Sequence, residues 1–171
     1  MQRVKIFTAL AVSLLTLACA TTPPGTEISS SDFDVQPLVG VWRGSFGSAQ
    51  TGRSGTVALT LRAGESSAKG NVVLLPRPDS LLTPEEREAP ENVNMPGRLV
   101  VGITFIRKEG GSLHGTLDPY TAPDCNCIVA TTFQGMFTDA NTIEGSFTTV
   151  PSKAGASVST GVWKVTRVKR L

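Results

Sequence analysis

From Leu38 onward, apolar and polar residues alternate in short runs, which is the pattern of half-buried β-strands. The clearest run is 55–63, in which Val57, Leu59 and Leu61 alternate with small or polar residues. The same alternation continues almost to the end of the chain. It predicts eight strands, at residues 39–48, 55–63, 68–75, 98–107, 112–118, 128–138, 142–150 and 158–169.

Eight strands joined mostly by short turns leave two unpaired edges unless the sheet closes on itself. Closure into a barrel removes both edges, so we expect an all-β fold, an antiparallel eight-stranded up-and-down β-barrel, over residues 38–171. Glycines recur inside the strands and permit the bends that a small barrel needs. A two-sheet β-sandwich is the alternative.

One connection, residues 76–97, is far longer than the others and contains five prolines. Within it, Thr83 followed by Pro84 predicts a helix start, with one or two helical turns to about Ala89. Leu81 and Leu82 precede this helix. One interpretation is a lid whose leucines pack into the barrel mouth, and the other is a solvated insertion.

The first 18 residues have the features of a signal peptide. Arg3 and Lys5 precede an apolar run of about 12 residues, which is shorter than the roughly 20 residues that span a bilayer. Residues 15–19 resemble the lipobox of bacterial lipoproteins, which implies a lipid on Cys19. The alternative is cleavage after Ala20, which releases a soluble periplasmic or secreted protein.

Residues 19–37 are polar, contain prolines and lack periodicity, so we expect a flexible linker between the lipid and the domain. Ala20, and not an aspartate, follows the cysteine. The resemblance to lipoproteins therefore implies the outer membrane of the cell envelope, with the domain facing the periplasm or the surface. The membrane, reached through the lipid anchor, is then the first predicted partner.

Charge excludes one class of partner. The chain has 16 basic and 14 acidic side chains, and the export segment contains Arg3 and Lys5, so the remainder has a formal net charge of zero. Nucleic-acid binding depends on neutralising phosphates with basic side chains. We therefore expect no nucleic-acid partner.

Cys125 and Cys127 are the remaining thiols once Cys19 is lipidated, and they face an oxidising compartment. Residues two apart in an extended strand lie roughly 6–7 Å apart at Cα, whereas a disulfide needs about 4.4–6.8 Å and converging Cβ atoms. A disulfide therefore requires a bend here, which Pro123 and Asn126 favour. Two reduced thiols, or a redox or metal site, are the alternatives.

The sequence lacks the patterns that carry common catalytic chemistry. It has a single histidine, His114, and no Gly-x-Ser-x-Gly elbow or phosphate-binding loop. A soft metal site needs more Cys or His ligands than these. We predict no catalytic residue, no metal and no cofactor, and hence a protein that is not an enzyme.

The chain resembles two groups of proteins. Gly40-Val41-Trp42 is similar to the Gly-x-Trp opening of lipocalins and avidin-like barrels. The resemblance implies that Trp42 closes the barrel base and that Arg167, in the last strand, packs across it. The lipocalin Thr-Asp-Tyr motif and C-terminal helix are missing from the sequence.

Residues 38–170 also resemble a group of short secreted bacterial proteins. The shared features are a Cys-x-Cys before a strand that reads Thr-Thr-Phe-x-Gly (here 131–135), a Thr-Ile-x-Gly-x-Phe strand (142–147) and a final Gly-x-Trp-x-Val-x-Arg (161–167). The resemblance implies a compact β-barrel and no particular activity. Because small barrels hold ligands in an apolar interior, we predict a binding module for a small apolar ligand. A filled barrel that serves a structural or interaction role in the envelope is the alternative.

Overall fold

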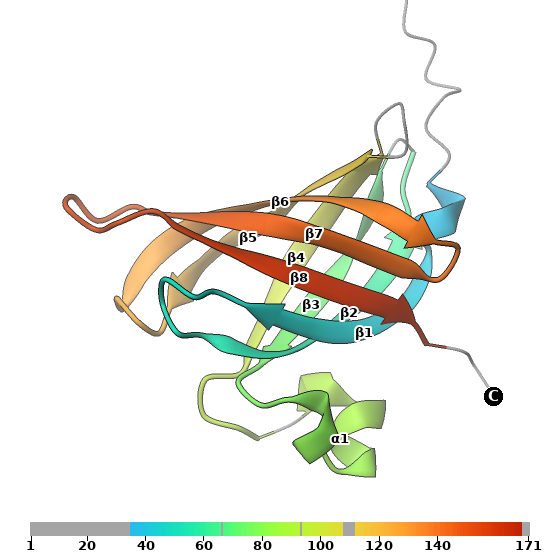
Figure 1. Ribbon diagram of the computed structural model, residues 1–171, viewed down its shortest axis with the longest axis horizontal. Coiled ribbons are helices and arrows are strands. Elements are labelled where there is room, and N and C mark those ends of the chain that lie inside the picture. Colours follow the sequence, from blue (N-terminus) through green and yellow to red (C-terminus); the bar gives the residue numbers. More distant parts are fainter. Residues whose placement is uncertain (1–34, 66, 93, 108–111, 169–171) are drawn as a thin grey trace, which may run out of the picture.

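The protein is a closed antiparallel β-barrel of eight strands in which each strand pairs with its neighbours in sequence and β8 pairs with β1 (Figure 1). The computed structural model describes residues 35–65, 67–92, 94–107 and 112–168. The up-and-down barrel is confirmed, and the β-sandwich alternative is wrong. The strands are β1 (Gly40–Gly47), β2 (Ser54–Ala63), β3 (Ala68–Leu75), β4 (Leu99–Arg107), β5 (Ser112–Ala122), β6 (Cys127–Asp139), β7 (Thr142–Pro151) and β8 (Ser159–Arg167).

The expected signal peptide at 1–18, the lipid site Cys19 and the linker up to residue 34 lie outside the described residues. The described chain begins at Val35, and Gln36–Leu38 form a short 3-10 helix, η2. Val35 and Leu38 are both buried, so this helix belongs to the folded domain. The predicted end of the flexible linker at residue 37 is therefore wrong, because residues 35–37 are part of the domain. Among the described residues, no helix is long and apolar enough to cross a membrane.

The base is the end of the barrel that η2 closes. Trp42 is fully buried there, and its Nε1 donates a hydrogen bond to the Leu38 carbonyl oxygen at 2.9 Å. The Trp42 ring also packs against Phe137, with ring centroids 6.1 Å apart. Aliphatic side chains from the remaining strands complete the packing, so the lower half of the barrel is filled. They include Leu61, Leu113, Ile143 and Val165.

The fifth strand continues four residues past the end that the sequence predicts. Its pairing with β6 shifts between Leu117 and Tyr120, and it then resumes up to Ala122. Pro119 lies within this shift, where a missing N–H is tolerated because a bulge interrupts the ladder. The predicted end at residue 118 is therefore wrong. A shift of one residue reverses which side chains face inward, and this shift directs Tyr120 into the barrel.

The long connection between β3 and β4 contains η3 (Asp79–Leu81), α1 (Pro84–Glu88) and η4 (Pro90–Asn92). The predicted helix is confirmed, and its start is a capping box. The Thr83 side chain accepts a hydrogen bond from the Glu86 N–H, and the Glu86 carboxylate accepts one from the Thr83 N–H. Such reciprocal bonds satisfy two N–H groups that a helix start otherwise leaves unpaired.

This insertion packs against the outside of the barrel, beside β2 and β3 (Figure 1). Leu82 is 4% exposed and lies in a cluster with Ala58, Val73 and Leu75, whereas Leu81 is 63% exposed. The interpretation of these leucines as a lid inside the mouth is therefore wrong. Leu82 instead attaches the insertion to the outer wall.

Candidate functional site: a cavity at the open end of the barrel

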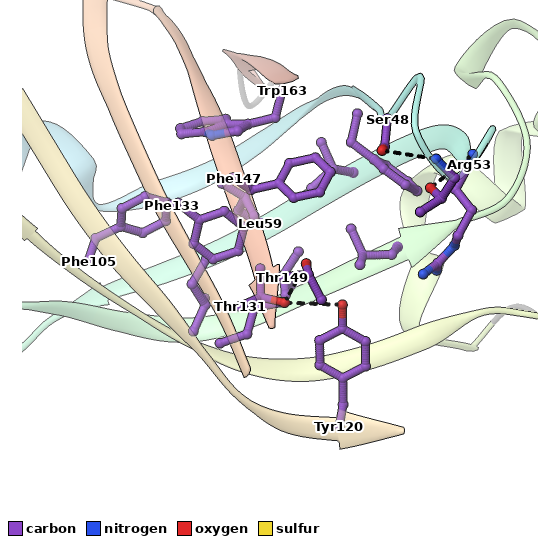
Figure 2. Close-up of a pocket in the computed structure, with 17 residues that line it drawn as sticks. Ser48, Arg53, Leu59, Phe105, Tyr120, Thr131, Phe133, Phe147, Thr149 and Trp163 are labelled. Atoms are coloured by element: carbon purple, nitrogen blue, oxygen red, sulfur yellow. Dashed lines mark hydrogen bonds between the residues drawn. The ribbon is translucent and has the colours of Figure 1, made fainter. Parts of the chain in front are cut away.

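The mouth is the end of the barrel opposite the base, surrounded by the loops 48–53, 76–98, 123–126 and 152–158. Below it lies a cavity of about 60 Å³ inside the barrel. Its lining is mainly apolar and comes from strands all around the barrel (Figure 2). The apolar residues of the lining include Phe46, Leu59, Leu74, Phe133, Phe147 and Trp163.

Three rings form the aromatic floor of this cavity: Phe105, Phe133 and Trp163. Their centroids lie 6.0–6.3 Å apart, and Phe133 and Trp163 meet edge to face. The Trp163 Nε1 donates a hydrogen bond to the Ser146 carbonyl oxygen at 3.1 Å, which fixes the ring. Gly135 makes room for it, because a Cβ at that position would lie 2.7 Å from the indole. The floor separates the cavity from the filled lower half.

Three hydroxyl groups meet on one side of the cavity, from β5, β6 and β7 (Figure 2). The Thr131 Oγ1 lies 3.3 Å from the Tyr120 hydroxyl and 2.9 Å from the Thr149 Oγ1. Thr131 is 3% exposed and Thr149 is 9% exposed. This hydroxyl triad is the main buried polar feature of the lining.

The rim of the mouth is polar, and its groups are paired. Ser48 Oγ donates a hydrogen bond to the Thr160 carbonyl oxygen at 2.6 Å and accepts one from the Thr51 N–H. Arg53 forms an ion pair with Asp124 at 3.3 Å, and both side chains are partly exposed. Arg53 is the charged side chain in the lining. The interior of the cavity is therefore apolar apart from its hydroxyls.

Cys125 and Cys127 lie in the turn between β5 and β6, next to Asp124 at the rim, and a disulfide joins them. Their Cα atoms are 5.1 Å apart, which is closer than an extended strand allows. The bend comes from Asn126, whose φ of 47° places it in the left-handed region. The sequence leaves three states open for these cysteines: a disulfide, two reduced thiols, or a redox or metal site. The structure shows the disulfide.

Trp42 and Arg167 meet at the base, not in the cavity. The Arg167 Cζ lies 4.1 Å from the centroid of the Trp42 ring. His114 is on the outer wall, where its backbone pairs with Gln134. No group of three metal-ligating side chains occurs among the residues that the structure describes. Trp42, Arg167 and His114 therefore do not line the cavity. Its lining offers apolar contacts, hydroxyl groups and, at the rim, the guanidinium of Arg53.

The hydroxyl triad was missed by the sequence analysis, although a signal for part of it exists. Thr131 and Phe133 share one face of β6, and Thr149 and Phe147 share one face of β7. Each threonine is therefore in phase with an inward phenylalanine. Tyr120 could not be placed the same way, because the shift at Pro119 changes its phase.

The sequence matches no protein-family model and no curated protein. Two solved structures are similar in fold. The structure of EF1p2_mFAP2b bound to DFHBI has a TM-score of 0.55 and 11% identity, covering 80% of this chain and 98% of that chain. The redesigned β-barrel mFAP1, bound to DFHBI, has a TM-score of 0.50 and 12% identity, covering 79% and 99%. At these identities the likeness establishes the class of fold, a small closed β-barrel.

Proposed function

We propose that this protein is a membrane-anchored lipoprotein of the bacterial envelope whose barrel binds a small apolar molecule through its mouth. The observation that carries the proposal is the unfilled apolar cavity above the aromatic floor. Its lining is mainly apolar, so a ligand that enters through the mouth removes its own apolar surface and that of the lining from water.

The two similar barrels support the capacity of the fold for a ligand, since both solved structures are bound to DFHBI, a small dye. The identities of 11% and 12% are too low to carry the ligand itself over. The chemistry of the ligand has to come from this cavity.

The anchor is supported by the sequence, through the apolar run before Cys19 and the polar residues after it. The described chain enters the domain at Val35, at the base. A lipid on Cys19 is therefore attached to the end opposite the mouth, and anchoring leaves the mouth free. Mass spectrometry of protein extracted from its native membrane tests this. The expected mass is that of residues 19–171 plus acyl chains, and a lipid-free mass beginning at Thr21 would contradict it.

A filled barrel that acts through envelope partners is the second candidate. It is favoured by the packed lower half and by the size of the cavity, because typical ligand pockets measure about 300–1,000 Å³. A large ligand would enter this barrel only if rings such as Phe46 and Phe147 moved aside. The two candidates differ in whether the interior takes up a small apolar probe.

Toluene is a suitable probe, and NMR titration of the Trp163 indole N–H reports its binding at the floor. Binding is expected to saturate at one toluene per barrel. Val57 lines the cavity, so Val57→Phe fills it and should weaken binding at least tenfold. Val100→Phe, on the outer wall where Val100 is 47% exposed, is the matched control and should leave binding unchanged. Absence of saturable binding would favour the filled barrel.

A further inference from the structure

The hydroxyl triad narrows the chemistry of the ligand. Resting on the proposed binding function, we propose that the ligand is a neutral, mainly apolar molecule that carries one hydrogen-bond acceptor, such as a ketone or ester carbonyl oxygen. The triad of Tyr120, Thr131 and Thr149 donates a hydrogen bond to that oxygen.

The triad has more O–H protons than it has internal hydrogen bonds. Each hydroxyl has one proton to donate, so the triad has three. Its two internal contacts, Tyr120 to Thr131 and Thr131 to Thr149, use two of them whichever way the bonds run. One O–H proton is always left over, on one of the three residues.

Among the described residues, these two contacts are the only hydrogen bonds made by the three side chains. Thr131 and Thr149 are at least nine-tenths buried, Tyr120 is partly buried, and all three residues line the cavity. Leaving a donor unpaired against an apolar lining is costly, because its hydration is lost without compensation. An acceptor oxygen on a ligand in the cavity removes that cost.

The charge of the surroundings decides between a neutral and an anionic acceptor. The charged side chain in the lining is Arg53, at the rim, and Asp124 already pairs with it. A carboxylate beside the triad would have neutral hydroxyls as its partners and would lose most of its hydration. Burying an ion in this way is far more costly than burying a carbonyl group.

The bulge in β5 places the Tyr120 hydroxyl next to the two threonines. The shift at Pro119 turns Tyr120 inward, where its hydroxyl completes the triad. On β6, Thr131 lies nearer the mouth than Phe133, so the triad lies on the wall between the aromatic floor and the mouth (Figure 2). A ligand therefore places its apolar part against the floor and its acceptor oxygen against this wall.

Two probes of nearly equal shape test the inference. Acetophenone carries a ketone oxygen, and α-methylstyrene has a CH₂ group in its place. NMR titration should show acetophenone binding about two- to tenfold more tightly, the difference expected for one hydrogen bond. In infrared spectra, the carbonyl stretch of bound acetophenone should lie at a lower wavenumber than in an apolar solvent. Benzoate should bind at least tenfold more weakly than acetophenone.

The variant that removes the donor must change all three residues. Any single substitution leaves at least one proton to spare. Removing the Tyr120 or Thr149 hydroxyl leaves two hydroxyls that share one bond, and removing the Thr131 hydroxyl leaves two that share none. Tyr120→Phe, Thr131→Val and Thr149→Val combined should abolish the preference for acetophenone while retaining α-methylstyrene binding. The matched control is Thr132→Val with Thr148→Val, the paired neighbours that point outward, and it should keep the preference.

The outcomes separate this inference from the binding function. Equal binding of the two probes to the unmodified protein overturns the inference and leaves the binding function standing, with water then satisfying the spare proton. A preference that survives the triple variant also overturns the inference. Binding of neither probe overturns both proposals. Should the triple variant fail to fold, the infrared measurement on the unmodified protein decides: an unshifted carbonyl stretch overturns the inference, and a lowered one supports it.

Discussion

The guanidinium of Arg167 lies over the indole of Trp42, with its Cζ 4.1 Å from the ring centroid. The same guanidinium donates hydrogen bonds to the carbonyl oxygens of Val39 and Pro37. The last strand is thereby tied both to the first strand and to η2, the helix that closes the base. One side chain thus holds the base together, and the cavity lies at the other end of the barrel.

Replacement of Arg167 should therefore destabilise the whole barrel. Arg167→Met keeps much of the side-chain volume and removes the charge and both hydrogen bonds. The expected loss in free energy of unfolding is about 2–4 kcal/mol, from hydrogen bonds by a charged donor and a cation–π contact. Urea unfolding monitored by Trp fluorescence measures it. Arg167→Lys retains the charge without the planar guanidinium, so its free energy of unfolding should lie between those of the original protein and the Met variant. A Met variant as stable as the original protein would contradict this prediction.

The strand pattern predicted the barrel because each inward face, such as Val57, Leu59 and Leu61, is buried against a shared core. The Trp42–Arg167 contact was also expected, although from resemblance and not from spacing. The inward position of Tyr120 was not predictable, because alternation fails at a bulge. The placement of Leu82 was equally hidden, since its burial depends on which surface a long insertion meets.

Leu82 and Leu81 form a matched pair for testing that placement. Leu82→Ala should cost about 2 kcal/mol, near the lower end for buried leucines because a surface cluster can partly collapse. Leu81→Ala, at an exposed position, should change the free energy of unfolding by less than about 0.5 kcal/mol. Limited trypsin digestion should also cleave faster at Arg87 in the Leu82 variant. Equal effects of the two substitutions would show that the insertion does not pack as described.

Gly44 and Gly47 test the seam where β1 meets β8. A Cβ on Gly44 would lie 1.8 Å from the Lys164 carbonyl oxygen, so the two strands would have to separate. Gly44→Ala should cost about 3 kcal/mol or more, at the upper end for overpacking. A Cβ on Gly47 would meet only Ser54 Cβ, at 3.8 Å. Gly47→Ala should be neutral or stabilising by about 0.5–1 kcal/mol. Similar thermal unfolding of both variants would argue against this seam.

Stability of the insertion should depend on acid through Glu86. The hydrogen bond from the Thr83 N–H lowers the pKa of this carboxyl below its ordinary value of 4.5, and Arg77 contributes in the same direction. A carboxyl with a lowered pKa in the folded state stabilises that state above its ordinary pKa and ceases to do so as pH falls through the lowered value. Amide protection in α1 should therefore decrease below about pH 4.5.

Glu86→Gln should remove most of this dependence, since the amide does not titrate and its oxygen can still accept from the Thr83 N–H. Glu88→Gln, at an exposed position of the same helix, is the control and should retain it. Hydrogen exchange expressed as protection factors measures both variants. If protection in the Glu86 variant falls with decreasing pH as much as in the unmodified protein, another group causes the acid dependence.

The disulfide between Cys125 and Cys127 should contribute little to global stability and more to the local order of the rim. It closes a loop of only three residues, for which chain entropy gives about 1.5 kcal/mol. Replacing both cysteines with serine should therefore lower the free energy of unfolding by no more than about that amount. Because Asp124 adjoins Cys125 and pairs with Arg53 across the mouth, amide exchange in the loops 48–53 and 123–126 should rise.

The intact unmodified protein should weigh two hydrogens less than its reduced form, and reduction should reproduce the exchange pattern of the double variant. A barrel that unfolds on reduction would show that this turn, and not the strand ladder, holds β5 and β6 together.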